Sequence, residues 1–189
     1  MSLSEERLAL FLLLGQTAEK SVREHPEVAP TDSLPISEAY DLATVLPEEV
    51  KRASRASDAY ELLFVFENFL RAFALSVLSE TDPEHWWDKV PKHVKDDAEE
   101  LEKKEETKAW MALAPRSKLS LATYPQLLDV IDQCWKHGFD STVRDKSLIQ
   151  EARHISHLRN AIGHMTEIPE EEIERIKQVM RDWFRMVAP

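Results

Sequence analysis

Hydrophobic side chains recur every three or four residues along most of the chain, which is the spacing of one face of an α-helix. Pro47 is followed by Glu48 and Glu49. Proline suits the first helical position and acidic side chains suit the positive end of the helix dipole. We therefore predict a core helix from residue 47 to about residue 78. Its apolar face contains Leu62, Phe66, Phe69, Leu70 and Phe73.

Further helices are predicted on both sides of this core helix. The apolar pattern predicts one over residues 4–22, a loop over 26–36, and a short helix to residue 46 capped by Ser37. Downstream we predict a charged helix over 92–108, a helix over 124–137 that stops at Gly138, and one over 144–163. A last helix follows Pro169, with an apolar stripe at Ile173, Ile176, Val179, Met180, Trp183 and Phe184.

Strands are not expected. No segment alternates apolar and polar residues, and the chain has only three glycines, whereas hairpins use glycine freely at their turns. The sequence therefore predicts an all-α fold, a helical bundle forming one compact unit overall. Trp86 and Trp87 are adjacent, so we expect one ring in the core and the other at its rim.

Charge and cysteine content narrow the setting of this 189-residue chain. A single cysteine forms no internal disulfide, which favours a reducing, cytoplasmic location. The apolar run at residues 8–14 is too short for a membrane span and follows two glutamates rather than a basic segment. The net charge of −11 repels nucleic acid, so any such role needs a local basic site. One stretch without carboxylates qualifies, containing Arg153, His154, His157, Arg159 and His164.

The strongest chemical signal is the hexapeptide that runs from Arg159 to His164. Asn160 and His164 are four residues apart and share a helix face, and the long Arg159 side chain can reach the same place. Arginine suits phosphate oxygens, and histidine exchanges protons near neutral pH. Such a group suits RNA cleavage by the 2′-hydroxyl, without a metal. A capping histidine beside a surface arginine is the alternative interpretation.

Other sites are weaker. Glu151 and His154 form a Glu-x-x-His pair, but the second pair that a carboxylate-bridged metal centre needs is missing, so no metal is predicted. Cys134 lies beside an apolar helix face and suits the core better than a nucleophile's role. Glycine-rich phosphate loops are absent, and no cofactor is predicted.

Three motifs in order resemble the HEPN superfamily. Residues 159–164 match its R-x4-6-H motif. Residues 67–71, from Glu67 to Arg71, resemble an E-x-x-L-R helix, and residues 86–91 resemble a W-W-x-x-x-P element. This combination is similar to the HEPN branch also found attached to a nuclear mRNA quality-control endonuclease, over about residues 58–187. It implies an HEPN-like up-down bundle over residues 58–189 behind an N-terminal helical extension, residues 1–57.

The resemblance also implies chemistry and partners. Many HEPN domains are homodimers in which two Arg–His motifs face each other across a cleft, and many are metal-independent endoribonucleases acting as toxins or antiviral effectors. Arg159 would hold the scissile phosphate of an RNA substrate, His164 would transfer protons and Asn160 would position them, leaving 2′,3′-cyclic phosphate ends. Glu67 and Arg71 would support the site or form a plain ion pair, and Arg153, His154 and His157 would line the cleft or be simply exposed.

One departure from the family pattern bears on which type of HEPN protein the chain resembles. Thr166 stands where the partners of minimal nucleotidyltransferases commonly carry a tyrosine, which weakens assignment to that toxin–antitoxin type. Two alternatives to an enzyme remain: a non-catalytic HEPN-like module that binds or dimerises within a larger complex, and a helical adaptor that docks a protein partner or antitoxin through residues 92–108.

Overall fold

The computed structural model describes residues 14–15, 17, 33–37, 40–106 and 117–187. By their contacts the residues form two compact units, Met1–Ser54 and Arg55–Pro189, whereas the sequence predicted one compact unit with a division after residue 57. The predicted bounds of the extension and the bundle stay a prediction. The helix predicted over residues 4–22 lies almost wholly outside the described residues, as does most of the loop predicted over 26–36.

The first unit contains a small hairpin that the sequence did not predict. Strands β1 (Pro35–Ser37) and β2 (Tyr40–Asp41) pair antiparallel. The short helix α2 (Leu42–Val45) follows and is capped by Asp41, whose carboxylate accepts hydrogen bonds from the backbone N–H groups of Ala43 and Leu34, each at 2.9 Å. The predicted cap at Ser37 is wrong, because that residue pairs with the second strand and cannot also begin a helix.

The predicted core helix is confirmed. Helix α3 spans Pro47–Thr81, begins at the predicted proline and extends three residues past the predicted end. Within the second unit, Phe66, Leu70, Ala74 and Leu78 are completely buried along one of its faces. By length and composition alone α3 would suffice to cross a membrane, a test that the core helix of a soluble protein also passes.

Two helices follow the core helix. Helix α4 (Trp86–Lys89) carries both adjacent tryptophans, and α5 (Lys92–Glu106) is the predicted charged helix. The expectation that one tryptophan fills the core while the other sits at its rim is wrong. Both rings are half-buried against the core with centroids 5.5 Å apart, because they pack edge to face against each other.

Helix α6 (Tyr124–Gln133) begins with a capping box made by Thr123 and Gln126 and ends before the predicted residue 137. A wider turn, Trp135–Phe139, separates it from the short helix α7 (Asp140–Thr142). Gly138 lies in this turn with a φ of 104°, so it ends the helical path as predicted. A single turn of 3-10 helix, Lys118–Leu121, precedes α6.

The helix predicted over residues 144–163 is interrupted. It forms α8 (Ser147–His154) and α9 (Ser156–Gly163), separated by a turn at Ile155, whose ψ of 0° differs from the value of about −42° in a regular helix. Ile155 itself is completely buried, so the break turns α9 while this side chain stays in the core. The last helix, α10 (Glu170–Val187), buries five of the six residues of its predicted stripe, and Phe184 is half-buried.

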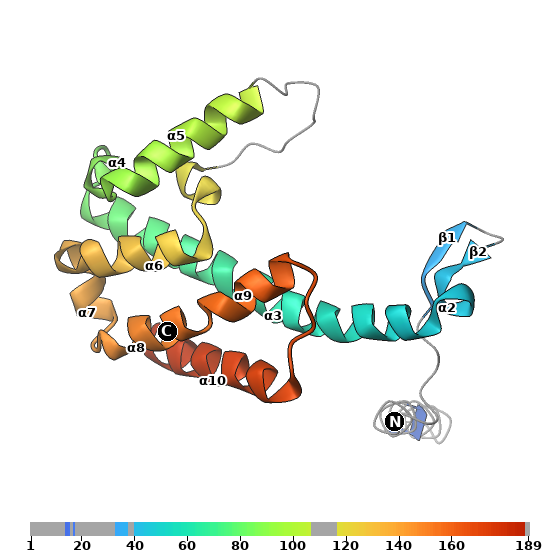
Figure 1. The fold of residues 1–189 in the computed structure, drawn as a ribbon. Helices are drawn as coiled ribbons and strands as arrows, with labels where there is room; N and C mark the ends of the chain where they lie inside the picture. The colour runs from blue at the N-terminus through green and yellow to red at the C-terminus, as the bar shows by residue number, and fades with distance from the viewer. Residues whose placement is uncertain (1–13, 16, 18–32, 38–39, 107–116, 188–189) are drawn as a thin grey trace, which may run out of the picture. The chain divides into compact units, whose positions relative to one another are not determined.

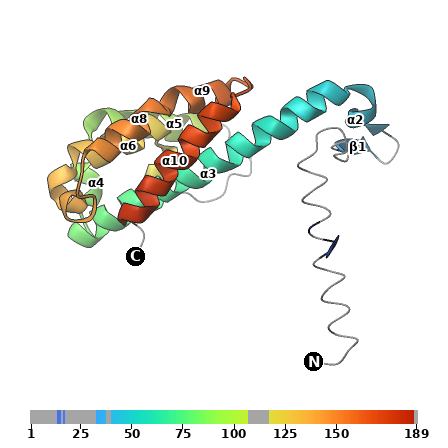
Figure 2. The ribbon, with the colours of Figure 1, turned by 90° about the horizontal axis from the view of Figure 1, so that it is seen from below.

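The second unit is a helical bundle, which confirms the predicted all-α class. Phe66 lies at its centre, with ring centroids 6.0 Å from Tyr124 of α6 and 6.1 Å from Trp183 of α10. Figures 1 and 2 show α6 and α10 beside α3. Helix α8 contacts α6 and α10, whereas α9 contacts α6 and α8. The motif helix α9 is therefore attached to the bundle and carries no completely buried residue of its own.

Candidate active site

The motif residues lie at the C-terminal end of α9. The last turn of the helix closes as a Schellman motif: the N–H of Thr166 donates to the carbonyl of Ala161, and that of Met165 to the carbonyl of Ile162, each at 2.9 Å. His164 is the last residue of the turn, and its own N–H donates to the carbonyl of Asn160 at 3.0 Å. Backbone hydrogen bonds thus fix where the His164 side chain leaves the helix.

Met165 occupies an unusual position beside this histidine. The Schellman motif needs a residue with positive φ, usually glycine, and Met165 takes that place with a φ of 58°. Its side chain is 92% exposed, so no packing compensates for the backbone strain. A strained, exposed apolar residue therefore stands next to the motif histidine, and such strain is concentrated at functional sites.

Arg159 reaches back from α9 to the core helix. Its Nε lies 3.4 Å from Oε2 of Glu67, a residue 92 positions earlier in α3. The Arg159 side chain is 36% exposed and that of Glu67 only 18%, so the guanidinium lies at the surface above a half-buried carboxylate. The structure therefore joins the R-x4-6-H motif to the E-x-x-L-R segment of the sequence.

Arg71 anchors Glu67 from below. One of its terminal nitrogens donates to Oε1 of Glu67 at 2.9 Å, and the other donates to the Asn68 side chain at 2.7 Å. Its Nε donates to the carbonyl of Leu119 at 3.1 Å, and the carbonyl of Ala122 accepts a further bond at 3.3 Å. Arg71 therefore cross-links α3 to the chain before α6, and it fixes the carboxylate that Arg159 meets.

The charge of this cluster is positive on balance, because one carboxylate faces two guanidinium groups. His164 and Asn160 are exposed, and within the described part of the chain their side chains make no hydrogen bond or ion pair. Burial and the negative charge of Glu67 raise the pKa of Tyr124, whose hydroxyl donates to the carbonyl of Ala152 at 2.8 Å. Arg159, Asn160 and His164 are each accessible to a ligand.

The remaining basic residues do not share one environment. Arg153, on α8, is bound by two aspartates of α6, with a terminal nitrogen 2.7 Å from Asp129 and the other 3.2 Å from Asp132. These contacts neutralise the arginine, so the stretch without carboxylates in the sequence acquires them on folding. His154 and His157 are exposed, on opposite sides of the break at residue 155.

Groups for other chemistry do not assemble in the described parts of the chain. No three His, Cys, Asp or Glu side chains are placed there to hold a metal ion. The Cys134 thiol is buried, which raises its pKa, and it donates to the carbonyl of Lys89 at 3.2 Å. Burial thus favours the protonated form of this thiol, which is a poor nucleophile.

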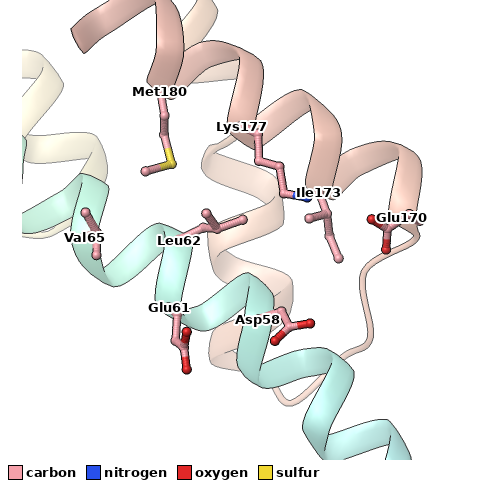
Figure 3. Close-up of a pocket in the computed structure, with 8 residues that line it drawn as sticks. All are labelled: Asp58, Glu61, Leu62, Val65, Glu170, Ile173, Lys177 and Met180. Carbon is pink, nitrogen blue, oxygen red and sulfur yellow. The ribbon is translucent and has the colours of Figure 1, made fainter. Parts of the chain in front are cut away.

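A groove between α3 and α10 was not anticipated from the sequence. It has a volume of about 380 Å³. Figure 3 shows its apolar floor bordered by acidic side chains and one lysine. The lining residues are Asp58, Glu61, Leu62, Val65, Glu170, Ile173, Lys177 and Met180. Because three carboxylates face one ammonium group, the groove is an unfavourable place for a phosphate backbone.

Comparison with protein families gave a match over most of the second unit. The family described as Swt1-like HEPN matches residues 61–188, which include α3 from Glu61 onward and the whole of α9 and α10. This match confirms the resemblance drawn from the three sequence motifs. Comparisons with curated proteins and with solved structures gave no match.

Proposed function

Since the chain belongs to the Swt1-like HEPN family, we propose that it is a metal-independent endoribonuclease with its active site at the end of α9. The observation that carries the proposal is the placement of Arg159 and His164. A half-exposed guanidinium and an exposed imidazole leave the same short helix, and Glu67, itself bound by Arg71, holds the guanidinium from the core helix.

The proposed reaction is an internal transfer at phosphorus. His164 removes the proton from the ribose 2′-hydroxyl, and the 2′-oxygen attacks the adjacent phosphorus. The bond from phosphorus to the 5′-oxygen breaks, and that oxygen takes up a proton, which leaves a 2′,3′-cyclic phosphate and a 5′-hydroxyl. Arg159 binds the non-bridging oxygens, where negative charge increases in the transition state. Asn160 orients the phosphate or the imidazole.

A second copy of the chain completes this proposal. One histidine cannot be base and acid in the same step, and each chain offers one motif histidine. In a homodimer with the two motifs facing each other, one His164 takes the proton from the 2′-hydroxyl and the other protonates the leaving 5′-oxygen. Sedimentation would then show a dimer, and mixing inactive His164→Ala chains with native ones would lower the activity per native chain.

The decisive test is cleavage of mixed RNA in the presence of EDTA. We expect the native protein to cut and the double variant Arg159→Ala/His164→Ala to be inactive while retaining its circular dichroism spectrum. A matched control is Arg175→Ala/His85→Ala, which removes an exposed arginine and an exposed histidine elsewhere in the unit. Equal cutting by native protein and the motif variant would refute the proposal, as would products without cyclic phosphate ends.

The pairing of Arg159 with Glu67 favours one alternative, a non-catalytic module. A guanidinium already paired with a carboxylate offers less charge to a phosphate, and such a pair also suits a site that only binds RNA or a partner subunit. This alternative predicts RNA or protein binding that the motif variant weakens, with no cutting by the native protein. Docking of a protein partner through the charged helix α5 would instead survive that variant.

We also propose a biological setting for this chemistry. An endoribonuclease of this type suits an effector in phage defence or in a toxin–antitoxin pair, acting in the cytoplasm. Such an effector needs an antitoxin or another trigger that keeps it inactive. Expression of the native protein should then arrest growth, whereas the Arg159→Ala/His164→Ala variant should not, and growth at equal expression of both would contradict the setting.

A further inference from the structure

Two aromatic rings on the core helix lie open to solvent. Tyr60 is 56% exposed and Phe64 is 57% exposed, and both follow Arg55 in the second unit. Their ring centroids are 6.0 Å apart with planes inclined by 33°, so the two rings touch without covering each other. In a helix whose other aromatic residues are at least half-buried, this pair is a conspicuous exposed apolar feature.

The helix geometry places these rings beside the candidate active site. Tyr60, Phe64, Glu67 and Arg71 are spaced by four, three and four residues, so they lie along one stripe of α3. Phe64 is three residues from Glu67, which corresponds to about 4.5 Å along the helix axis. Slightly less than one turn of helix therefore separates the Phe64 position from the residue whose carboxylate meets Arg159.

Two ion pairs set the register between the motif segment and α3. Arg159 meets Glu67 at 3.4 Å, and Glu167 meets Arg55 at 3.0 Å. As the numbers rise from 159 to 167, the contacts on α3 descend from 67 to 55, so the two segments run antiparallel. The stretch of α3 between these contacts contains both exposed rings, and the opposite stretch contains His164.

Charge distinguishes the ring side of α3 from the groove side. The carboxylates of Asp58, Glu61 and Glu170 border the groove in Figure 3, and a polyanion would be repelled there. The stripe with the rings instead leads to the Arg159 and Arg71 cluster, which is positive on balance. A ligand that presents flat apolar groups at one end and a phosphate at the other matches this stripe.

We propose that Tyr60 and Phe64 form a stacking platform for the bases of single-stranded RNA next to the scissile phosphate. Aromatic rings accept any base, because every base has a π-face, and stacking of this kind is typical of single-strand binding. The platform rests on the proposed function and deepens it. It makes the substrate single-stranded, with little dependence on base identity at the stacked positions.

The test measures binding separately from cutting. Fluorescence anisotropy at low salt would follow a short single-stranded 2′-O-methyl RNA, which lacks the attacking hydroxyl, and a matched strand with abasic sites. The variants are Tyr60→Ala/Phe64→Ala and Tyr60→Leu/Phe64→Leu. The controls are the ring-preserving exchange Tyr60→Phe/Phe64→Tyr and the change Val65→Ala, which trims an exposed apolar residue of the groove.

Stacking predicts that both ring-deleting variants bind the base-bearing strand roughly tenfold or more weakly, because the stacked bases lose their aromatic contacts. Their binding of the abasic strand should match that of the native protein, and both controls should leave binding unchanged. Full binding by the leucine variant would overturn the proposal, since leucine restores apolar area without a π-face.

Two further outcomes separate this inference from its alternatives. If the alanine variant sediments as a smaller species and loses the abasic strand equally, the rings form a protein contact and the proposal is wrong. If the native protein binds with the ring dependence but cuts nothing, the platform stands and the proposed catalysis fails. Undiminished binding and cutting by the alanine variant would reject the platform alone, whereas a native protein that neither binds nor cuts would reject both.

Discussion

The Oε2 atom of Glu67 lies 3.4 Å from the Nε atom of Arg159, although 92 residues separate them in the sequence. This contact joins the core helix to the motif helix and sets the direction of the guanidinium. It also means that a phosphate approaching Arg159 meets a carboxylate beside its partner, so Glu67 both positions the arginine and competes for it.

We expect the change Glu67→Gln to tighten RNA binding and slow cutting. Removing the negative charge beside Arg159 should lower the KM by roughly two- to fivefold, which is the size expected of a partly exposed charge pair. Losing the ion pair frees the guanidinium to rotate, so kcat should fall. The matched control is Glu172→Gln, whose carboxylate lies at the same 3.4 Å from Arg175 on α10. A raised KM in the Glu67 variant would contradict this account.

Replacement of Arg71 should destabilise the bundle. The change Arg71→Ala leaves the carbonyls of Leu119 and Ala122 without this donor, and Glu67 without its closest cation. We expect the free energy of unfolding to fall by about 2–4 kcal/mol, as for other half-buried charged networks that lose a partner. Urea titration followed by tryptophan fluorescence would measure the loss. Arg55→Ala, which breaks an exposed pair, should cost less than about 1 kcal/mol.

Met165 offers a stabilising change. Met165→Gly should raise the free energy of unfolding by up to about 1 kcal/mol, because glycine adopts a positive φ without the clash that an L side chain suffers. Met165→Ala is the control, since it removes the exposed side chain and keeps the strained backbone, and it should give no gain. Equal stabilisation by both variants in a thermal melt would show that side-chain exposure, rather than backbone strain, is responsible.

Two glycines should respond oppositely to alanine. Gly138 has a φ of 104°, and an added Cβ would lie 2.8 Å from the Thr81 hydroxyl oxygen and 3.0 Å from a methyl carbon of Val77. Gly138→Ala should therefore cost about 2 kcal/mol or more. Gly163→Ala lies in α9 with its nearest contact at 3.8 Å, so it should stabilise by up to about 1 kcal/mol. Chemical denaturation of both variants would check the difference in sign.

Acid should remove the contribution of Asp132. A hydrogen bond from Lys146 is the main reason why the pKa of Asp132 is lowered, and the charge of Arg153 adds to it. A lowered folded-state pKa stabilises the protein above the unfolded pKa, and this stabilisation disappears as the pH falls through the folded value. Asp132→Asn should therefore be less stable than native protein at neutral pH, by up to about 1 kcal/mol. The two unfolding curves should converge once the pH has fallen below the lowered pKa of Asp132, where the carboxyl is protonated in both states.

The helical spacing of apolar residues accounts for most of what the sequence predicted correctly about the fold. The stripes of α3 and α10 were visible because each of these helices buries one continuous face, and a helix signal of this kind needs only the local sequence. The pairing of β1 with β2 was not predicted, because these strands are too short to show an alternation of apolar and polar residues. The break at Ile155 was not predicted, because this apolar residue fits the pattern of an unbroken helix and only its ψ angle differs.

The sequence identified which residues form the candidate site, but it did not show which side chains they contact. The spacing of Arg159 and His164 identified the motif, whereas the contact with Glu67 depends on how α9 crosses α3. Arg153 shows the opposite case. Its neighbours in sequence left it free, and packing of α8 against α6 brought two aspartates to it. Local sequence does not encode either partner, because both come from other helices.

Arg71 links the chain before α6 to the candidate active site. Arg71 donates hydrogen bonds to the carbonyls of Leu119 and Ala122, in the connection that leads into α6. This connection also contacts α5. The same guanidinium donates to the carboxylate of Glu67, which meets Arg159. A displacement of residues 118–122 would pull on Arg71, and Arg71 would pass the movement through Glu67 to the guanidinium. A partner that binds α5 would thus change the orientation of the Arg159 side chain without contacting it.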